Sequence, residues 1–108
     1  MQAAGVSPIA DALHGRRERE NTVADGVRIE HPVRGPEIRT AIEETDGDAI
    51  AVTGEETDAA LDRLHRHGFY VEPTSAVGPA GLHVYRDRGV LEEGDDVVVA
   101  LTGSGLKA

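Results

Sequence analysis

The sequence DVVVALTGSGLKA, residues 96–108, joins an apolar run to a glycine loop. A second stretch, FYVEPTSA at residues 69–76, likewise places hydroxyl-bearing and small residues directly after an apolar run. Both apolar runs are predicted to be strands, and their loops resemble the carboxyl edge of a parallel sheet. Because open α/β sheets bind ligands at that edge, the sequence predicts a ligand site there.

Apolar spacing and helix-end signals predict alternating helices and strands. The signals are Ser or Thr before a helix, Pro in its first turn and Gly after its end. Helices are expected over residues 7–15, 36–47, 53–68 and a last segment that ends at 89. Extended segments are expected at 27–29, 48–52, 69–71 and 96–101. This alternation predicts an α/β fold with right-handed βαβ units around a parallel sheet.

Two local features refine the helix predictions. Thr53 and Glu56 stand three residues apart at a helix start, the spacing of a capping box. Pro79 lies inside the last helical segment, where an interior proline would remove a hydrogen bond and clash with the preceding turn. That helix is therefore expected either to begin near Gly78-Pro79 or to begin at Pro73 and be kinked.

Composition restricts the classes of function. The 108 residues suffice for one domain, and the aromatic share of 3% requires a core of Val, Ile, Leu and Ala. The formal net charge is -9, from 20 acidic and 11 basic residues, so binding to nucleic acid or to a membrane surface is not expected. All basic residues but one are arginine, a balance typical of proteins from a high-salt cytoplasm. An acidic protein of an ordinary cytoplasm is the alternative.

Cysteine and histidine usage argues against redox and metal chemistry. The chain has no cysteine, which excludes disulfides and thiolate catalysis. His65 and His67 lie two apart on an expected helix and therefore point to different faces. His14, His31 and His83 lie in separate elements with no acidic partner at ligand spacing, so no metal site is expected. The start of the chain has neither a basic region nor a long apolar run, which predicts a cytoplasmic location.

Several polar motifs allow both a functional and a structural interpretation. The mixed-charge run at 16–21 is a solvated segment or, alternatively, a phosphate clamp weakened by its own glutamates. Glu72 follows a predicted strand and precedes Pro73, so its carboxylate is placed to orient a substrate or a cofactor. The alternative is that Glu72 or Thr74 caps the start of a helix. The loop at 102–105 offers hydroxyls and backbone donors to a ligand or is a plain turn. It lacks the spacing of a dinucleotide fingerprint or a P-loop.

A set of motifs extends over essentially the whole chain in a recognisable order. They are QAAGVSPIADAL, NTVADGVRI, DAIAV, VEPTSA, AGL and VVVALTGSGLK. In this order they resemble the C-terminal part of the threonine synthase family, and LTGSGLK favours that family over related dehydratases and cysteine synthases. The resemblance implies that residues 1–108 form a single partial domain. Its expected architecture is a partial open parallel sheet with flanking helices, as in the C-terminal part of fold type II pyridoxal-phosphate enzymes.

The resemblance also implies a role in cofactor binding. In that family the hydroxyl residue after the last strand, here Thr102, meets the pyridine nitrogen of pyridoxal phosphate. Glu72 and Ser75 would lie near the cofactor ring. The family's cofactor-binding lysine and its phosphate-binding glycine loop have no counterpart here, and the only lysine is Lys107. No catalytic residue is therefore assigned, and pyridoxal phosphate is expected to bind only together with a missing N-terminal part.

The full enzyme would convert O-phosphohomoserine and water to threonine and phosphate, and this chain alone is expected to be inactive. Its expected partner is an N-terminal subunit or domain that carries the lysine, with homo-oligomerisation left open. One alternative is a non-catalytic interaction or regulatory module that kept the fold. Another is a degenerate fragment, which would show no cooperative melting.

Overall fold

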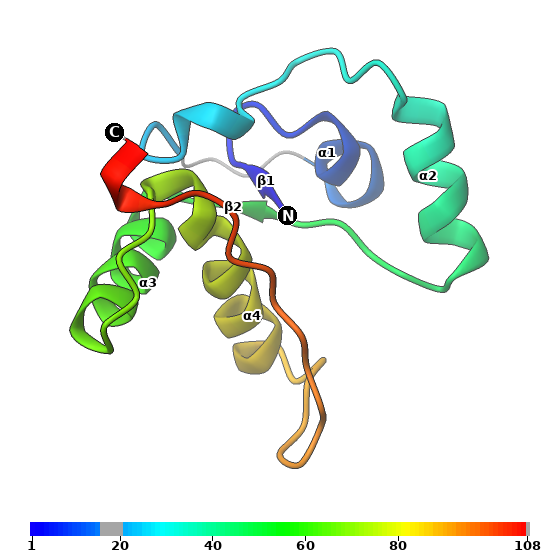
Figure 1. Cartoon of the computed structure of the whole chain (residues 1–108). Helices are drawn as coiled ribbons and strands as arrows, with labels where there is room; N and C mark the ends of the chain where they lie inside the picture. The colour runs from blue at the N-terminus through cyan, green and yellow to red at the C-terminus, as the bar shows by residue number, and fades with distance from the viewer. Residues whose placement is uncertain (16–20, 108) are drawn as a thin grey trace.

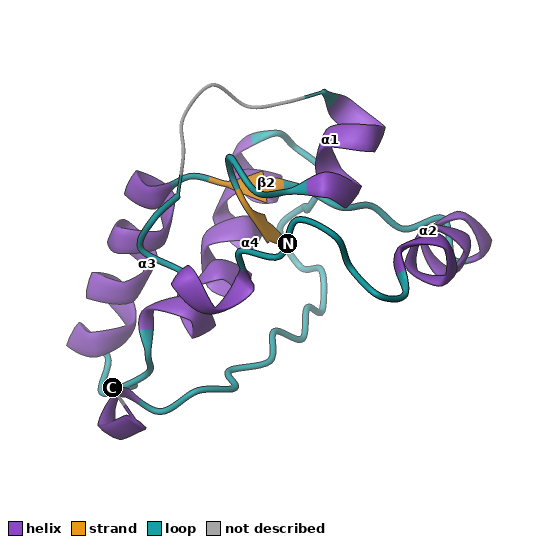
Figure 2. Cartoon of the chain, turned by 90° about the horizontal axis from the view of Figure 1, so that it is seen from above, coloured by secondary structure: helices purple, strands orange, loops and turns teal. Residues whose placement is uncertain are grey.

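The computed structural model describes residues 1–15 and 21–107 (Figure 1). Its strands and helices are β1 (Gln2–Ala3), α1 (Pro8–His14), α2 (Gly35–Glu44), β2 (Ala51–Val52), α3 (Gly54–Arg66) and α4 (Val77–Asp87). Short 3-10 turns occur at Asp25–Val27, Pro73–Ala76 and Gly105–Lys107. Seen from above, α3 and α4 lie on one side of the strands, and α1 and α2 lie on the other (Figure 2).

The two strands pair in parallel, with Gln2 opposite Ala51 and Ala3 opposite Val52. β2 is fully enclosed, as expected for the apolar run at 48–52, and Val52 has no exposed surface. The chain is therefore an α/β fold with a small parallel sheet and flanking helices, as predicted. β1 is absent from the predicted elements because two residues are too few to show a strand periodicity.

The core lies on both sides of β2 and consists largely of alanine and aliphatic residues, as the low aromatic content requires. The larger cluster joins β2 to α3 and α4 and contains Ala24, Ile50, Val52, Ala60, Ala76, Val77, Ala80 and Val84. The smaller cluster joins β2 to α1 and contains Ala4, Ile9, Ala10, Ala49 and Ala51. Helix α2 has no buried residue, although its Ile42 packs against the smaller cluster.

Asn21 connects the strands to α3 from a fully buried position. Its side-chain NH2 donates to the carbonyl of Val52 (2.9 Å) and to the hydroxyl of Thr57 (2.8 Å). Its side-chain oxygen accepts from the amides of Val23 (3.0 Å) and Ala24 (3.1 Å). Asn21 is the last residue of the mixed-charge run, of which residues 16–20 lie outside the described residues. The expectation of a solvated run is therefore wrong at Asn21.

The helix ends follow their sequence signals. α1 begins at Pro8 and is followed by Gly15 with a φ of 80°. The capping box of α3 is present: the Thr53 hydroxyl accepts from the amide of Glu56 (3.3 Å), and the Glu56 carboxylate accepts from the amide of Thr53 (2.9 Å). The Ser7 hydroxyl makes no cap and instead donates to the Asp11 carboxylate (2.7 Å).

Pro79 is accommodated at the start of the last helix. Residues 73–76 form a separate 3-10 turn, and α4 then begins at Val77. Pro79 thus stands in the first helical turn, where a backbone N–H would have no partner within the helix. Of the two alternatives, the helix that begins near Gly78-Pro79 is the one observed, and it begins one residue earlier, at Val77.

Three expected extended segments are not strands of the sheet. Val27 lies in the 3-10 turn at Asp25–Val27. In the segment 69–71, only Val71 pairs, through an isolated antiparallel bridge to Ser104. The run at 96–101 forms no ladder with any described residue. Strand formation requires a neighbour, and apolar periodicity alone does not supply one. Across 1–15 and 21–107, no helix combines the length and apolar character needed to span a bilayer.

We expect Asn21→Ala to destabilise the fold by about 3 kcal/mol, because it removes the hydrogen bonds of a buried side chain and leaves the backbone amides of Val23 and Ala24 without their acceptor. Urea unfolding followed by circular dichroism measures the change. The matched control is Thr22→Ala at the exposed neighbouring residue, for which a change within about 0.5 kcal/mol is expected. Equal effects of the two substitutions would contradict the role given to Asn21.

Candidate functional site

The two loops that the sequence singles out lie side by side. We call residues 70–76 the first loop and residues 102–107 the terminal loop. The amide of Glu72 donates to the carbonyl of Gly103 (3.0 Å). Figure 1 shows the red end of the chain beside the turn that leads into α4. The tertiary structure thus brings Glu72, Ser75 and Thr102 into one site.

Glycines allow this close approach of the loops. A Cβ atom at Gly103 would overlap the side chain of Glu72. A Cβ atom at Gly105 would lie 2.6 Å from the ring of Tyr70, whose carbonyl accepts from the Gly105 amide (3.0 Å). The glycines of LTGSGLK are therefore required by packing between the loops, which a plain terminal turn would not demand.

The Ser75 side chain holds the terminal loop through the backbone amide of Thr102. Its hydroxyl accepts from the amide of Thr102 (2.9 Å), and its side chain is buried. Thr102 itself is exposed, and its hydroxyl makes no hydrogen bond with the described residues. The carboxylate of Glu72 is half-buried and makes no hydrogen bond or ion pair with them either. Thr102 and Glu72 therefore retain polar atoms for a ligand, whereas Ser75 acts on the position of Thr102.

A third segment reaches the same edge. The amide of Gly26 donates to the hydroxyl of Thr74 (3.1 Å), and a Cβ atom at Gly26 would lie 2.9 Å from that hydroxyl. The helix-cap interpretation of Glu72 and Thr74 is wrong, because neither side chain caps the turn at Pro73–Ala76. Sequence reasoning missed Gly26 as part of the site. The signal that could have found it is the motif NTVADGVRI, which contains it.

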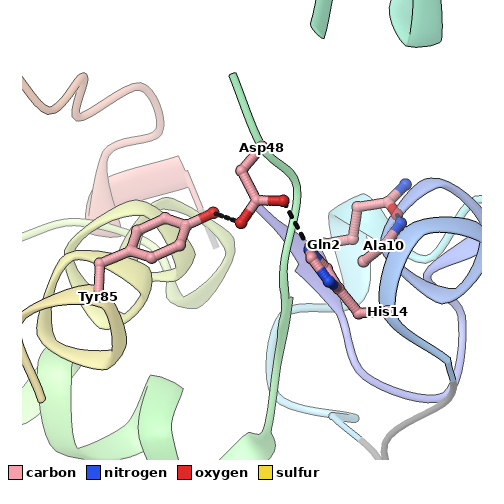
Figure 3. Close-up of polar contacts among 5 residues, drawn as sticks. All are labelled: Gln2, Ala10, His14, Asp48 and Tyr85. Atoms are coloured by element: carbon pink, nitrogen blue, oxygen red, sulfur yellow. Dashed lines mark hydrogen bonds and ion pairs between the residues drawn. The ribbon is translucent and has the colours of Figure 1, made fainter. Parts of the chain in front are cut away.

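The fold also assembles a polar cluster that sequence spacing does not show. His14 lies 2.6 Å from one carboxylate oxygen of Asp48, and the hydroxyl of Tyr85 donates to the other at 3.0 Å (Figure 3). The cluster joins α1, the segment before β2 and α4. The sequence shows no acidic partner for His14 because Asp48 lies 34 residues away.

Within 1–15 and 21–107, no group of three or more His, Cys, Asp or Glu side chains is placed to hold a metal ion.

The cluster shifts the pKa of two of its members. Burial acts to raise the pKa of Asp48, but hydrogen bonds from His14, from the Ala49 backbone and from Tyr85 outweigh it and leave that pKa lowered. Burial, together with the hydrogen bond to the Asp48 carboxylate, raises the pKa of Tyr85 to about 12. These effects are electrostatic links between elements and do not involve the loop site.

Comparison with known proteins identifies the family. The sequence profile of pyridoxal-phosphate dependent enzymes matches residues 1–103. The chain belongs to that family. The chain is also 37% identical over 114 residues to the threonine synthase of Methanocaldococcus jannaschii, covering 99% of this chain and 28% of that protein. It is 40% identical to the threonine synthase of Methanosarcina acetivorans, with the same coverage.

A bacterial relative gives the same result. The threonine synthase of Mycobacterium leprae is 36% identical over 107 residues, covering 98% of this chain and 29% of that protein. The chain therefore spans a little more than a quarter of the length of the curated relatives it matches. The cofactor of the family is pyridoxal phosphate.

The described residues fit one edge of this cofactor. The exposed Thr102 hydroxyl has no partner among them and is suited to a hydrogen bond with a ring nitrogen. The remaining requirements are not met by this chain. Its only lysine, Lys107, belongs to the terminal 3-10 turn, and no glycine-rich phosphate loop is present.

We expect Gly103→Ala to destabilise the chain by about 1–2 kcal/mol, because the added Cβ must displace the Glu72 side chain. In a Glu72→Ala background the same substitution should cost clearly less. A double-mutant cycle by urea unfolding measures this coupling. Gly35→Ala is the control, since a Cβ at Gly35 would meet only Pro32, at 3.8 Å. Additive effects at positions 72 and 103 would contradict the proposed contact.

We expect Asp48→Asn to reduce stability by less than about 1 kcal/mol near neutral pH, because its partners are partly exposed. Since the pKa of Asp48 is lowered in the folded state, its contribution is present above the ordinary carboxyl pKa of about 4 and is lost as pH falls through the lower, folded-state pKa. The stability difference between the wild type and the variant should therefore shrink on acidification. Urea unfolding between neutral pH and about pH 3 tests this, and a difference that grows would contradict it.

Proposed function

We propose that this chain is the C-terminal segment of a threonine synthase-like enzyme and supplies one wall of its pyridoxal-phosphate site. The proposal rests on how Thr102 is held and exposed. Its backbone is held by Ser75, while its hydroxyl is exposed and has no partner among the described residues. The match to threonine synthases over 98–99% of the chain supports the same assignment.

Each residue of the wall has a distinct part. The Thr102 hydroxyl would bind the pyridine nitrogen of the cofactor, and because a hydroxyl is neutral it would not force that nitrogen to stay protonated. Ser75 is a positioning residue that fixes Thr102 through its amide. Glu72 lies against Gly103, and its side chain would lie near the cofactor ring. Pyridoxal phosphate, when bound, supplies the electron sink of the reaction.

The overall reaction we assign to the complete enzyme is conversion of O-phosphohomoserine and water to threonine and phosphate. The covalent attachment of the cofactor and its phosphate site lie in a lysine-bearing N-terminal part. That part is either a separate subunit or a domain of a longer chain. This chain by itself is accordingly inactive. A cytoplasmic location and adaptation to high salt stay predictions from the sequence.

A non-catalytic interaction module is the second candidate. It is favoured by large apolar side chains that are exposed on this chain, among them Val33 and Val98, each 98% exposed. Such a module would bind its partner without any need for the Thr102 hydroxyl. A degenerate fragment, the remaining alternative, would show no cooperative unfolding.

The test combines this chain with the lysine-bearing part of the Methanosarcina acetivorans relative, pyridoxal phosphate and O-phosphohomoserine. We expect phosphate release only when both parts are present. Thr102→Val should reduce kcat/KM by about 10- to 100-fold, the effect of one lost hydrogen bond at a reacting group. Thr102→Ser, which keeps the hydroxyl, is the control. Unchanged activity of Thr102→Val would reject the cofactor contact, and activity of this chain alone would reject its incompleteness.

A further inference from the structure

Residues 96–101, which we call the terminal segment, lie extended beside α4 without pairing to any described strand. In Figures 1 and 2 the segment runs along α4 and leads into the terminal loop. A Cβ atom at Gly78 of α4 would lie 3.1 Å from the Val99 side chain, so the segment rests closely on that helix.

The side chains of the segment alternate between two faces. Val99 and Leu101 line an apolar groove of about 360 Å³ with residues of α3 and α4, and Val97 lines a second hollow with Leu82 and Arg86 of α4. Val98 is 98% exposed, and Ala100 is also exposed. A run that is apolar at every position is typical of a strand covered on both faces. Here one face rests on the helices and is partly covered, with Val97 46% and Leu101 39% exposed, and the other face is open.

The two edges of the segment are open as well. Within the described residues, no backbone hydrogen bond reaches any residue from 96 to 101, and the first one after the segment is made by the amide of Thr102. Extended backbone with unpaired N–H and C=O groups is a template for an added strand. The segment therefore lacks both a neighbouring strand and a cover for Val98.

We propose that the terminal segment becomes a β-strand by pairing with a strand of the lysine-bearing part, which also covers Val98. The proposal rests on the proposed function for the identity of this partner. The chain spans 28% of its archaeal relatives, so most of such a protein lies outside it and is available to supply the strand. A second copy is a poorer occupant, since it would bring together two chains of net charge -9.

The pairing would act directly on the cofactor wall. Thr102 follows the last residue of the segment, and Ser75 already fixes its amide. Once residues 96–101 are paired, the backbone of Thr102 is held from both the segment and Ser75. Docking of the lysine-bearing part would therefore also fix the position of the Thr102 hydroxyl.

The test measures hydrogen exchange and association with the same lysine-bearing part. In this chain alone, amides 96–101 should exchange at nearly the unfolded rate, and in the complex at least about 10-fold more slowly. Val97→Pro and Val98→Pro remove donors from opposite edges of the segment. At least one of them should weaken association by about 10-fold, whereas Val98→Ile, which keeps both the amide donor and an apolar side chain, should not. Circular dichroism checks that the variants fold, as expected because neither amide has a hydrogen bond here.

The outcomes separate this inference from the proposed function. If both parts together are active but residues 96–101 stay unprotected and neither proline variant weakens association, the docking strand is rejected and the proposed function stands. If the segment is protected but Thr102→Val retains full activity, the cofactor contact is rejected and the docking strand stands. Protection of 96–101 in the absence of the lysine-bearing part, together with dimerisation, would assign the strand to a second copy and overturn the proposal.

Discussion

The arrangement of this chain depends on the hydrogen bonds of the buried Asn21 side chain. Its NH2 group binds the end of β2 and the start of α3, and its backbone amide donates to Ala4 beyond β1 (2.8 Å). A buried amide must satisfy all of these groups at once, so it permits few alternative arrangements. The turn that it orders places Gly26 against Thr74, and the segment from Asn21 thereby reaches the edge formed by the two loops.

The site itself is built from close backbone contacts. Two loops approach because glycine stands where a Cβ atom would overlap Glu72 or lie too close to the ring of Tyr70, and the buried Ser75 hydroxyl fixes the amide of Thr102. This construction uses backbone groups for support and leaves the Thr102 side chain available. It also explains why a loop at the end of an unpaired segment is held in place. Positioning comes from the first loop, and the sheet contributes nothing to it here.

Local signals predicted local structure well. The capping box at Thr53, the start of α1 at Pro8 and its end at Gly15 all depend on residues within one or two turns of each other. The predicted strand at 96–101 forms no ladder with any described residue, because apolar periodicity does not specify which segment pairs with which. The contact between His14 and Asp48 was not predictable for a related reason, since 34 residues separate them.

The sequence by itself determined the α/β class and most helix ends, and it named Glu72, Ser75 and Thr102 as candidate site residues. These features can be read from local patterns and from the order of the motifs, because none of them depends on the distance between residues far apart in the chain. The tertiary structure alone decided that Ser75 supports Thr102, that Gly26 joins the edge, and that Asn21 is buried in the core. Those facts depend on which segments meet in space, and side-chain packing and buried hydrogen bonds settle that after the local elements have formed.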